Sequence, residues 1–198
     1  MIQLQRQEYD AVVVGSGISG GWAAKELCEK GLKTLVLERG RDLRHGDYPT
    51  EHVPSWEFPL LDRRLTAEQA PEHPLQSHVY LFRESTRHHF IEDARSPYVQ
   101  ARPFLWIQGD QVGGRSLTWG RGTYRLSDLD FTANQIDGHG VDWPIRYADI
   151  APWYSHVERF AGISGKAEGL AHFPDGEFQP PIEMNAGEKF VKAGLERA

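Results

Sequence analysis

A short glycine-rich stretch near the start of the chain has the residue types and spacing of a phosphate-binding loop. Residues 15–20 read GSGISG, a G-x-G-x-x-G pattern, and Glu38 follows about 20 residues later. In this pattern Gly15 permits a tight turn, Gly17 lets a pyrophosphate approach the backbone, and Gly20 permits close helix packing. A carboxylate at position 38 can accept hydrogen bonds from a ribose and repels a 2′-phosphate, which disfavours NADP.

The residues around this loop predict a strand, a helix and a second strand. The apolar run 11–14 predicts a parallel strand covered on both faces, and apolar pairs at i,i+4 spacing predict a helix over 18–29. Gly31 ends the helix, and residues 34–37 predict a second strand with Glu38 at its tip. This order favours a site for the ADP half of a dinucleotide. The alternative is a tight strand–helix turn that binds nothing.

Composition narrows the class of protein. The 198 residues are 39% apolar with a formal net charge of −6, which is typical of one globular core and argues against a nucleic-acid partner. Cys28 is the single cysteine, so no internal disulfide is possible, and we expect it to be a small core residue on the inner side of the helix. Residues 1–8 are polar and no apolar run could span a bilayer. The sequence as written therefore predicts a cytoplasmic protein without membrane insertion, or a periplasmic one if a leader was removed.

The chain after residue 40 predicts an irregular insertion. Prolines recur through 41–62, where a simple NAD dehydrogenase would add another strand and helix, and this favours a flavoprotein. Adjacent histidines at 88 and 89 have no third ligand at metal-binding spacing, so we favour a solvated or packed loop over a metal site. Further on, the pattern predicts a helix over 61–70 and strands within 77–90 and 98–108. It also predicts helices over 152–160 and 185–198. The buried stripe expected on the first of these two helices consists of Tyr154, Val157, Phe160 and Ala161.

A second glycine-rich segment spans Val112–Gly122 and reads VGGRSLTWGRG. Glycines beside a hydroxyl and an aromatic residue allow the backbone to lie flat against a planar or charged ligand. The alternative is a glycine-rich turn before a strand. Arg115 and Arg121 could face either a phosphate or water, and the residues do not separate these possibilities.

With both glycine segments in view, the sequence resembles the glucose–methanol–choline (GMC) family of flavoenzymes. The resemblance rests on VVVGSGISGGWAAKEL with LERG, on QVGGRSLTWGR, and on DWPIRYADIAPWYSHVERFAGISG. It is nearest to bacterial sugar and gluconate dehydrogenase flavin subunits and to pyranose oxidase. The resemblance implies an α/β fold, in which a Rossmann-like FAD-binding βαβ unit carries a long irregular insertion on an incomplete sheet. It also implies that the chain is the N-terminal part of a larger, two-domain flavoenzyme.

The resemblance implies four segments and a set of FAD contacts. The segments are the βαβ unit 1–40, the insertion 41–108, a second FAD-contacting region 109–142, and the start of a helical, substrate-domain segment 143–198. The second loop would follow the pyrophosphate, the ribityl chain and the isoalloxazine. In pyranose oxidases a histidine in that loop bonds the flavin covalently; Thr118 stands there, so we expect non-covalent FAD. The residues implied to contact FAD are Gly15, Ser16, Gly17, Gly20, Glu38, Arg39, Gly113, Gly114, Ser116, Leu117, Thr118 and Trp119.

The resemblance also implies a reaction, namely oxidation of a sugar or polyol alcohol by hydride transfer to flavin N5. A small partner subunit and a cytochrome would accept the electrons. The family's catalytic histidine lies near the C-terminal end of longer chains, so we name no catalytic residue here and expect this stretch alone to be inactive. Two alternatives stay open at this point: an NAD-dependent dehydrogenase domain, and an inactive, truncated dinucleotide-binding module.

Overall fold

The computed structural model describes residues 7–48, 50–63, 70–92 and 94–197. It divides into two compact units, Met1–Gly120 and Arg121–Ala198, each with its own internal contacts. The helix predicted over 61–70 falls largely outside the described residues. The four-segment division predicted from the sequence stays a prediction.

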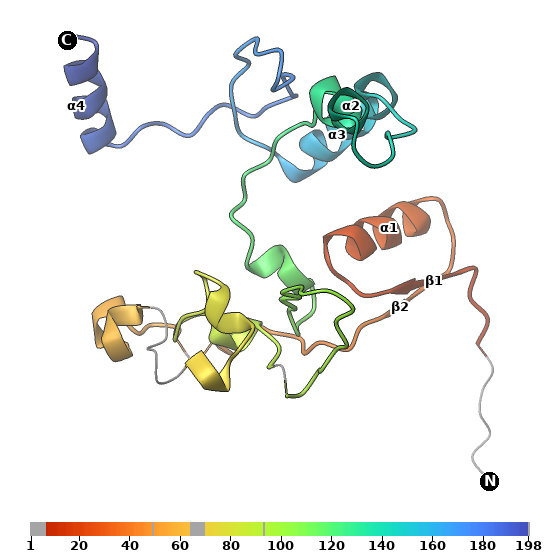
Figure 1. Cartoon of the computed structure of the whole chain (residues 1–198), viewed down its shortest axis with the longest axis vertical. Helices are drawn as coiled ribbons and strands as arrows, with labels where there is room; N and C mark the ends of the chain where they lie inside the picture. The colour runs from red at the N-terminus through yellow and green to blue at the C-terminus, as the bar shows by residue number, and fades with distance from the viewer. Residues whose placement is uncertain (1–6, 49, 64–69, 93, 198) are drawn as a thin grey trace. The chain divides into compact units, whose positions relative to one another are not determined.

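The first unit contains the predicted βαβ arrangement. Strand β1 (Ala11–Val14) is followed by helix α1 (Ile18–Glu29) and strand β2 (Thr34–Leu37). The strands are parallel, in register from Ala11 opposite Thr34 to Val14 opposite Leu37. Helix α1 packs against both strands and lies across one face of the pair (Figure 1). The Rossmann-like fold class predicted from the sequence, with its irregular insertion, is confirmed.

Close packing between α1 and the end of β1 requires glycine at position 20. A Cβ atom built on Gly20 would lie 1.9 Å from the carbonyl oxygen of Gly15 and 3.4 Å from Cγ1 of Val13. The first distance is far inside van der Waals contact, so any side chain here would push the helix away from the loop that precedes it.

Two sequence-based expectations about burial in this unit are wrong. Strand β1 was expected to be covered on both faces, yet Val12 is 56% exposed and Val14 is 81% exposed. The reason is that α1 covers one face of the pair and no described element covers the other. Cys28 was expected in the core and is exposed. A sheet of two described strands is too narrow to bury the whole inner flank of the helix.

The insertion after β2 folds into short 3-10 turns. Its core consists of Phe82, Phe90 and Ile91, and the rings of Phe82 and Phe90 meet edge to face at 5.6 Å. The strands predicted within 77–90 and 98–108 are wrong, since the described part of these segments forms no strand and has only isolated bridge residues, such as Phe90 opposite Gly109. Turn hydrogen bonds satisfy the backbone locally here, so no partner strand is needed. The turns are Ser55–Glu57, Pro59–Asp62, Ala70–Glu72, Gln76–His78 and Arg87–His89.

The second unit contains helices α2 (Asp128–Asp137), α3 (Tyr147–Ala161) and α4 (Ala186–Leu195). Helix α4 confirms the prediction for the C-terminal segment, and α3 begins five residues earlier than predicted. Its early start follows from Asp149, whose carboxylate accepts the backbone N–H of Arg146 at 2.8 Å and caps the helix. Helix α2 was not predicted, although Ser127 followed three residues later by Asp130 is its capping signal.

A buried ion pair lies at the centre of this second unit. Arg125 is 8% exposed and donates two hydrogen bonds to the carboxylate of Glu158, at 2.8 and 2.6 Å. Burial alone would raise the pKa of Glu158, but hydrogen bonds from Arg125 and the Glu177 backbone outweigh it and lower that pKa. The buried stripe predicted for α3 is wrong at Phe160, which is 61% exposed, and at Ala161, which is also exposed. Tyr154 and Val157 are only half-buried. Helix α3 buries Glu158 instead, because the guanidinium of Arg125 pairs with its charge and hydrogen-bonds its carboxylate.

Within the residues that the structure describes, no helix combines the length and apolar character needed to cross a membrane.

Candidate functional site

Glu38, directly after β2, bridges the first glycine loop and the chain that leaves the strand. Its Oε2 accepts hydrogen bonds from the backbone N–H of Ser16 at 2.7 Å and from the Ser16 hydroxyl at 2.6 Å. Its Oε1 accepts the backbone N–H of Gly40 at 2.7 Å. The Ser16 hydroxyl, followed by these two backbone donors, lowers the pKa of Glu38 to about 2. The carboxylate is therefore charged at neutral pH and already holds the loop in place.

The two glycine loops, far apart in the sequence, meet in the structure. The backbone N–H of Gly113 donates to Oγ of Ser16 at 3.0 Å across 97 residues of sequence. A Cβ atom on Gly114 would lie 3.4 Å from Cα of Gly17, which is tight contact. Gly113 and Gly114 have φ values of +85° and +54°, a left-handed conformation that other residues rarely adopt. The second loop is therefore folded back directly onto the first.

The continuation of β2 brings the second loop to this position. Arg41 and Gln111 form a parallel bridge, in which the Val112 N–H donates to the Arg41 carbonyl at 3.0 Å. The Gln111 side chain, only 1% exposed, accepts the Asp110 N–H at 2.9 Å and donates to the Gly114 carbonyl at 2.8 Å. Sequence reasoning missed Gln111 as a site residue. The feature that could have indicated it is a side-chain amide placed shortly before the double glycine.

The residues present fit a dinucleotide. Helix α1 begins at Ile18, and Gly17, its N-cap residue, has no side chain to occupy the N–H groups of the first turn. These N–H groups and the helix dipole favour a diphosphate, and the glycine surfaces of both loops let it approach the backbone. Glu38 accepts two hydrogen bonds on Oε2 and one on Oε1, and the backbone of Arg39 also lowers its pKa, so the protein itself supplies most of the donors to this carboxylate.

The other residues predicted to contact FAD lie around these loops, and their roles stay predictions. Ser116, in the short helix η6 (Gly114–Leu117) that packs against α1, donates its hydroxyl to the Gly113 carbonyl at 2.7 Å. Leu117 and Trp119 are exposed, at 38% and 41%, and Thr118 is half-buried. Arg39 turns away from the loops to donate to the side-chain oxygen of Gln108 at 3.0 Å.

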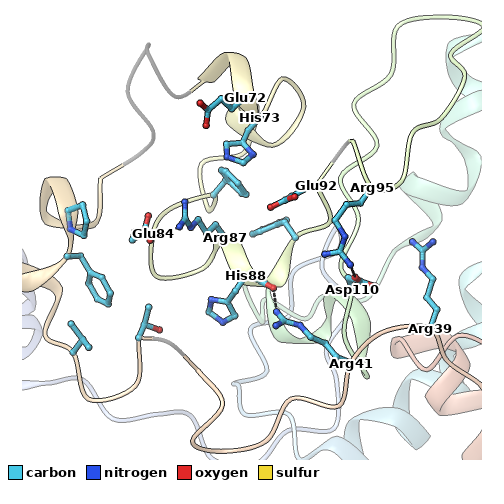
Figure 2. A pocket seen from close by; sticks show the side chains of 16 residues that line it. Arg39, Arg41, Glu72, His73, Glu84, Arg87, His88, Glu92, Arg95 and Asp110 are labelled. Carbon is cyan, nitrogen blue, oxygen red and sulfur yellow. Dashed lines mark hydrogen bonds and ion pairs between the residues drawn. The ribbon is translucent and has the colours of Figure 1, made fainter.

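A cavity of about 920 Å³ opens in the insertion beside Arg39 (Figure 2). Four carboxylates and four arginines line it, beside two histidines, so the cavity has no dominant charge with the histidines neutral. Each arginine in its wall already contacts a protein oxygen. Arg39 donates to the side-chain oxygen of Gln108, and Arg41 donates to the His88 carbonyl. Arg87 pairs with the carboxylate of Glu84 at 3.1 Å, and Arg95 pairs with that of Asp110 at 3.7 Å. The lining therefore indicates no particular ligand.

The paired histidines are packed together inside the insertion. The rings of His88 and His89 are 4.0 Å apart, and each lies 5.9 Å from the ring of Tyr48. Both ring nitrogens of His88 are buried without a hydrogen-bond partner. Burial, followed by the charges of His89 and Arg41, lowers the pKa of His88 to about 4. Among the described residues, no three His, Cys, Asp or Glu side chains gather as metal ligands.

Comparison with known proteins agrees with this site. A family model described as an NAD(P)-binding Rossmann-like domain matches residues 13–71. The chain is 28% identical over 189 residues, 94% of its length, to paromamine 6′-oxidase of Streptomyces fradiae. It is 27% identical to the fructose dehydrogenase large subunit of Gluconobacter japonicus over 89% of its length, and 28% identical to the gluconate 2-dehydrogenase flavoprotein of Pantoea cypripedii over 81%. Over most of its length the chain is therefore similar to flavoenzymes of the GMC oxidoreductase type.

The resemblance to GMC oxidoreductases predicted from the sequence is thereby confirmed. The chain spans 28%, 31% and 26% of the lengths of those three relatives, respectively. The first glycine loop and the contacting part of the second, up to Gly120, lie within the first compact unit, which therefore contains the contacts of the candidate site described above.

Proposed function

We propose that this chain is the FAD-binding portion of an oxidoreductase that acts on the CH–OH group of a sugar or polyol. The observation that carries the proposal is the contact between the two glycine loops, where the Gly113 N–H reaches Oγ of Ser16 at 3.0 Å. That contact makes one continuous backbone surface from two loops, which suits a ligand longer than a single nucleotide. Similarity to GMC oxidoreductases and the relative named as a flavoprotein support flavin over nicotinamide.

In this proposal the chain's own residues bind and orient the cofactor. The first-turn N–H groups of α1 hold the diphosphate, Glu38 orients the adenosine ribose, and Gly113 and Gly114 cover the diphosphate from the other side. When bound, the flavin accepts a hydride from the carbon that carries the substrate hydroxyl. We assign no catalytic base in this chain. Thr118 has no nucleophilic nitrogen, so the FAD is held without a covalent bond.

The substrate and partner classes are supported by the relatives. Their names specify paromamine, fructose and gluconate, all polyhydroxylated compounds or amino sugars, which favours a sugar or polyol over a simple alcohol. One of them is named as a large subunit, which supports a partner subunit for this chain. We propose that the electrons pass to such a partner and then to a cytochrome.

Titration of the purified chain with FAD tests the cofactor. We expect saturable quenching of flavin fluorescence at one FAD per chain, and release of all bound flavin into the supernatant on acid precipitation. NADH titrated in parallel decides the alternative that the matching domain model raises, a nicotinamide site. Saturable NADH binding with no flavin binding, by this chain and by a longer version that extends it, would refute the proposal.

A further inference from the structure

Ser16 connects the three segments that form the candidate site. Its hydroxyl accepts the Gly113 N–H at 3.0 Å and donates to Glu38 Oε2 at 2.6 Å, while its own N–H donates to the same oxygen at 2.7 Å. The second loop, the first loop and the tip of β2 are thus linked in a single chain of hydrogen bonds. The residue at position 16 lies between two glycines, and the G-x-G-x-x-G pattern leaves its identity open.

The direction of these hydrogen bonds is determined by the chemistry of the groups. A backbone N–H can only donate and an ionised carboxylate can only accept, so a group between them must do both. A hydroxyl has one hydrogen and two lone pairs, and it therefore satisfies both neighbours at once. An alanine at position 16 would leave the Gly113 N–H without this acceptor and would remove one of the three donors to Glu38.

We propose that Ser16 is a positioning residue for FAD, whose hydroxyl holds the two glycine loops at the separation at which both contact one dinucleotide. This inference rests on the proposed function. In this proposal the bonds stay intact when the nucleotide binds, because the Ser16 hydroxyl is engaged between Gly113 and Glu38 and not with the ligand. Ser16 therefore acts through Gly113 and Glu38, and its side chain need not touch the cofactor.

The test compares two ligands of different reach in the whole chain. AMP, with a single phosphate, occupies the first loop and the tip of β2, whereas FAD, with its full diphosphate and flavin half, extends along the second loop. For Ser16→Ala we expect the Kd for FAD to rise about tenfold, the effect of one hydrogen bond, and the Kd for AMP to rise less than about threefold. Ser55→Ala, at an exposed serine of the insertion outside both glycine loops, is the matched control and should change neither Kd.

Hydrogen exchange of the Gly113 amide supplies a readout that needs no ligand. The wild-type amide should be protected, and Ser16→Ala should lose that protection while the amides of α1 keep theirs. Ser16→Thr, which retains the hydroxyl, should keep both the protection and the FAD affinity, and it replaces Ser16→Ala in the argument if that variant does not fold.

Three results would overturn the inference: an unprotected Gly113 amide in the wild-type chain, an unchanged FAD affinity in Ser16→Ala, or equal losses of FAD and AMP affinity. Failure of the proposed function is distinguishable, because a wild-type chain that binds no FAD can still show whether Ser16 protects Gly113.

Discussion

Replacement of Glu38 by glutamine tests how the site is held together before any ligand binds. The carboxylate accepts donors on both oxygens, two from Ser16 and one from Gly40. An amide has only one acceptor oxygen. In Glu38→Gln, either the Ser16 side or the Gly40 side must therefore face an NH₂ group that cannot accept its hydrogen bond.

The size of the effect follows from the pKa of Glu38. Its depression from an ordinary value of 4.5 to about 2 corresponds to at most about 3 kcal/mol of stability at neutral pH. Solvent reaches this half-buried group, so screening reduces the expected loss in Glu38→Gln to about 1–2 kcal/mol in the free energy of unfolding.

The sign of the pH dependence is determined by which state binds the proton first. The folded-state pKa lies below the unfolded one, so as the pH falls the unfolded chain is protonated before the folded chain. The contribution of the carboxylate is complete above about pH 4.5 and is lost as the pH falls towards about 2. The difference between wild type and Glu38→Gln should therefore be full at pH 7 and should shrink through this window.

Urea denaturation, read by hydrogen exchange of residues 11–40, measures this unit separately from the rest of the chain. Glu29→Gln is the matched control, since Glu29 is exposed and pairs with Lys25 at 2.7 Å on the surface of α1, which predicts a change below about 0.5 kcal/mol. A Glu38→Gln effect no larger than that of the control, or one that is the same at pH 7 and pH 2.5, would refute the reasoning.

Three further predictions concern packing and charge. Gly20→Ala should destabilise the first unit by about 1–3 kcal/mol and weaken FAD binding. Gly21→Ala, whose Cβ would lie 3.5 Å from its nearest atom, should retain both the stability and the FAD affinity. Urea denaturation and FAD titration measure the two effects. Glu158→Gln breaks a buried ion pair, so it should lower the free energy of unfolding of the second unit by about 3–5 kcal/mol in denaturation experiments. Glu177→Gln removes an exposed pair and should lower it by less than about 1 kcal/mol. Equal losses would contradict the buried character of the Glu158 pair. The insertion should lose stability as the pH falls from about 6.5 to about 4, because His88 is protonated in the unfolded chain before it is protonated in the folded chain. Hydrogen exchange of the insertion measures this loss as a function of pH. His88→Phe should flatten that pH profile if His88 is responsible.

The local part of this protein could be predicted from its sequence. The bounds of β1, α1 and β2 follow from apolar periodicity and glycine placement within about 30 residues, where near neighbours in the chain are also near neighbours in space. The glycine pattern and Glu38 indicated a nucleotide site for the same reason. Helix α4 was predicted because its face and its capping residue Asn185, which accepts the Glu188 N–H at 3.0 Å, are both local.

Where the sequence misled, a contact with a distant partner decided the outcome. Glu158 is buried on α3 because Arg125, 33 residues earlier, satisfies its charge, and the apolar stripe alone could not show that. Aromatic alternation in the insertion was interpreted as strands, but Phe82 and Phe90 instead pack on each other between turns.

The sequence by itself determined the nucleotide-binding unit and the family resemblance, because glycines, an acid and apolar periodicity carry that information over short distances. Only the tertiary structure decided that Gly113 lies on Ser16 and that Gln111 is buried beneath the second loop. The physical reason is that such contacts join residues up to 97 positions apart. Their formation depends on how the intervening insertion packs, and no local spacing in the chain records that.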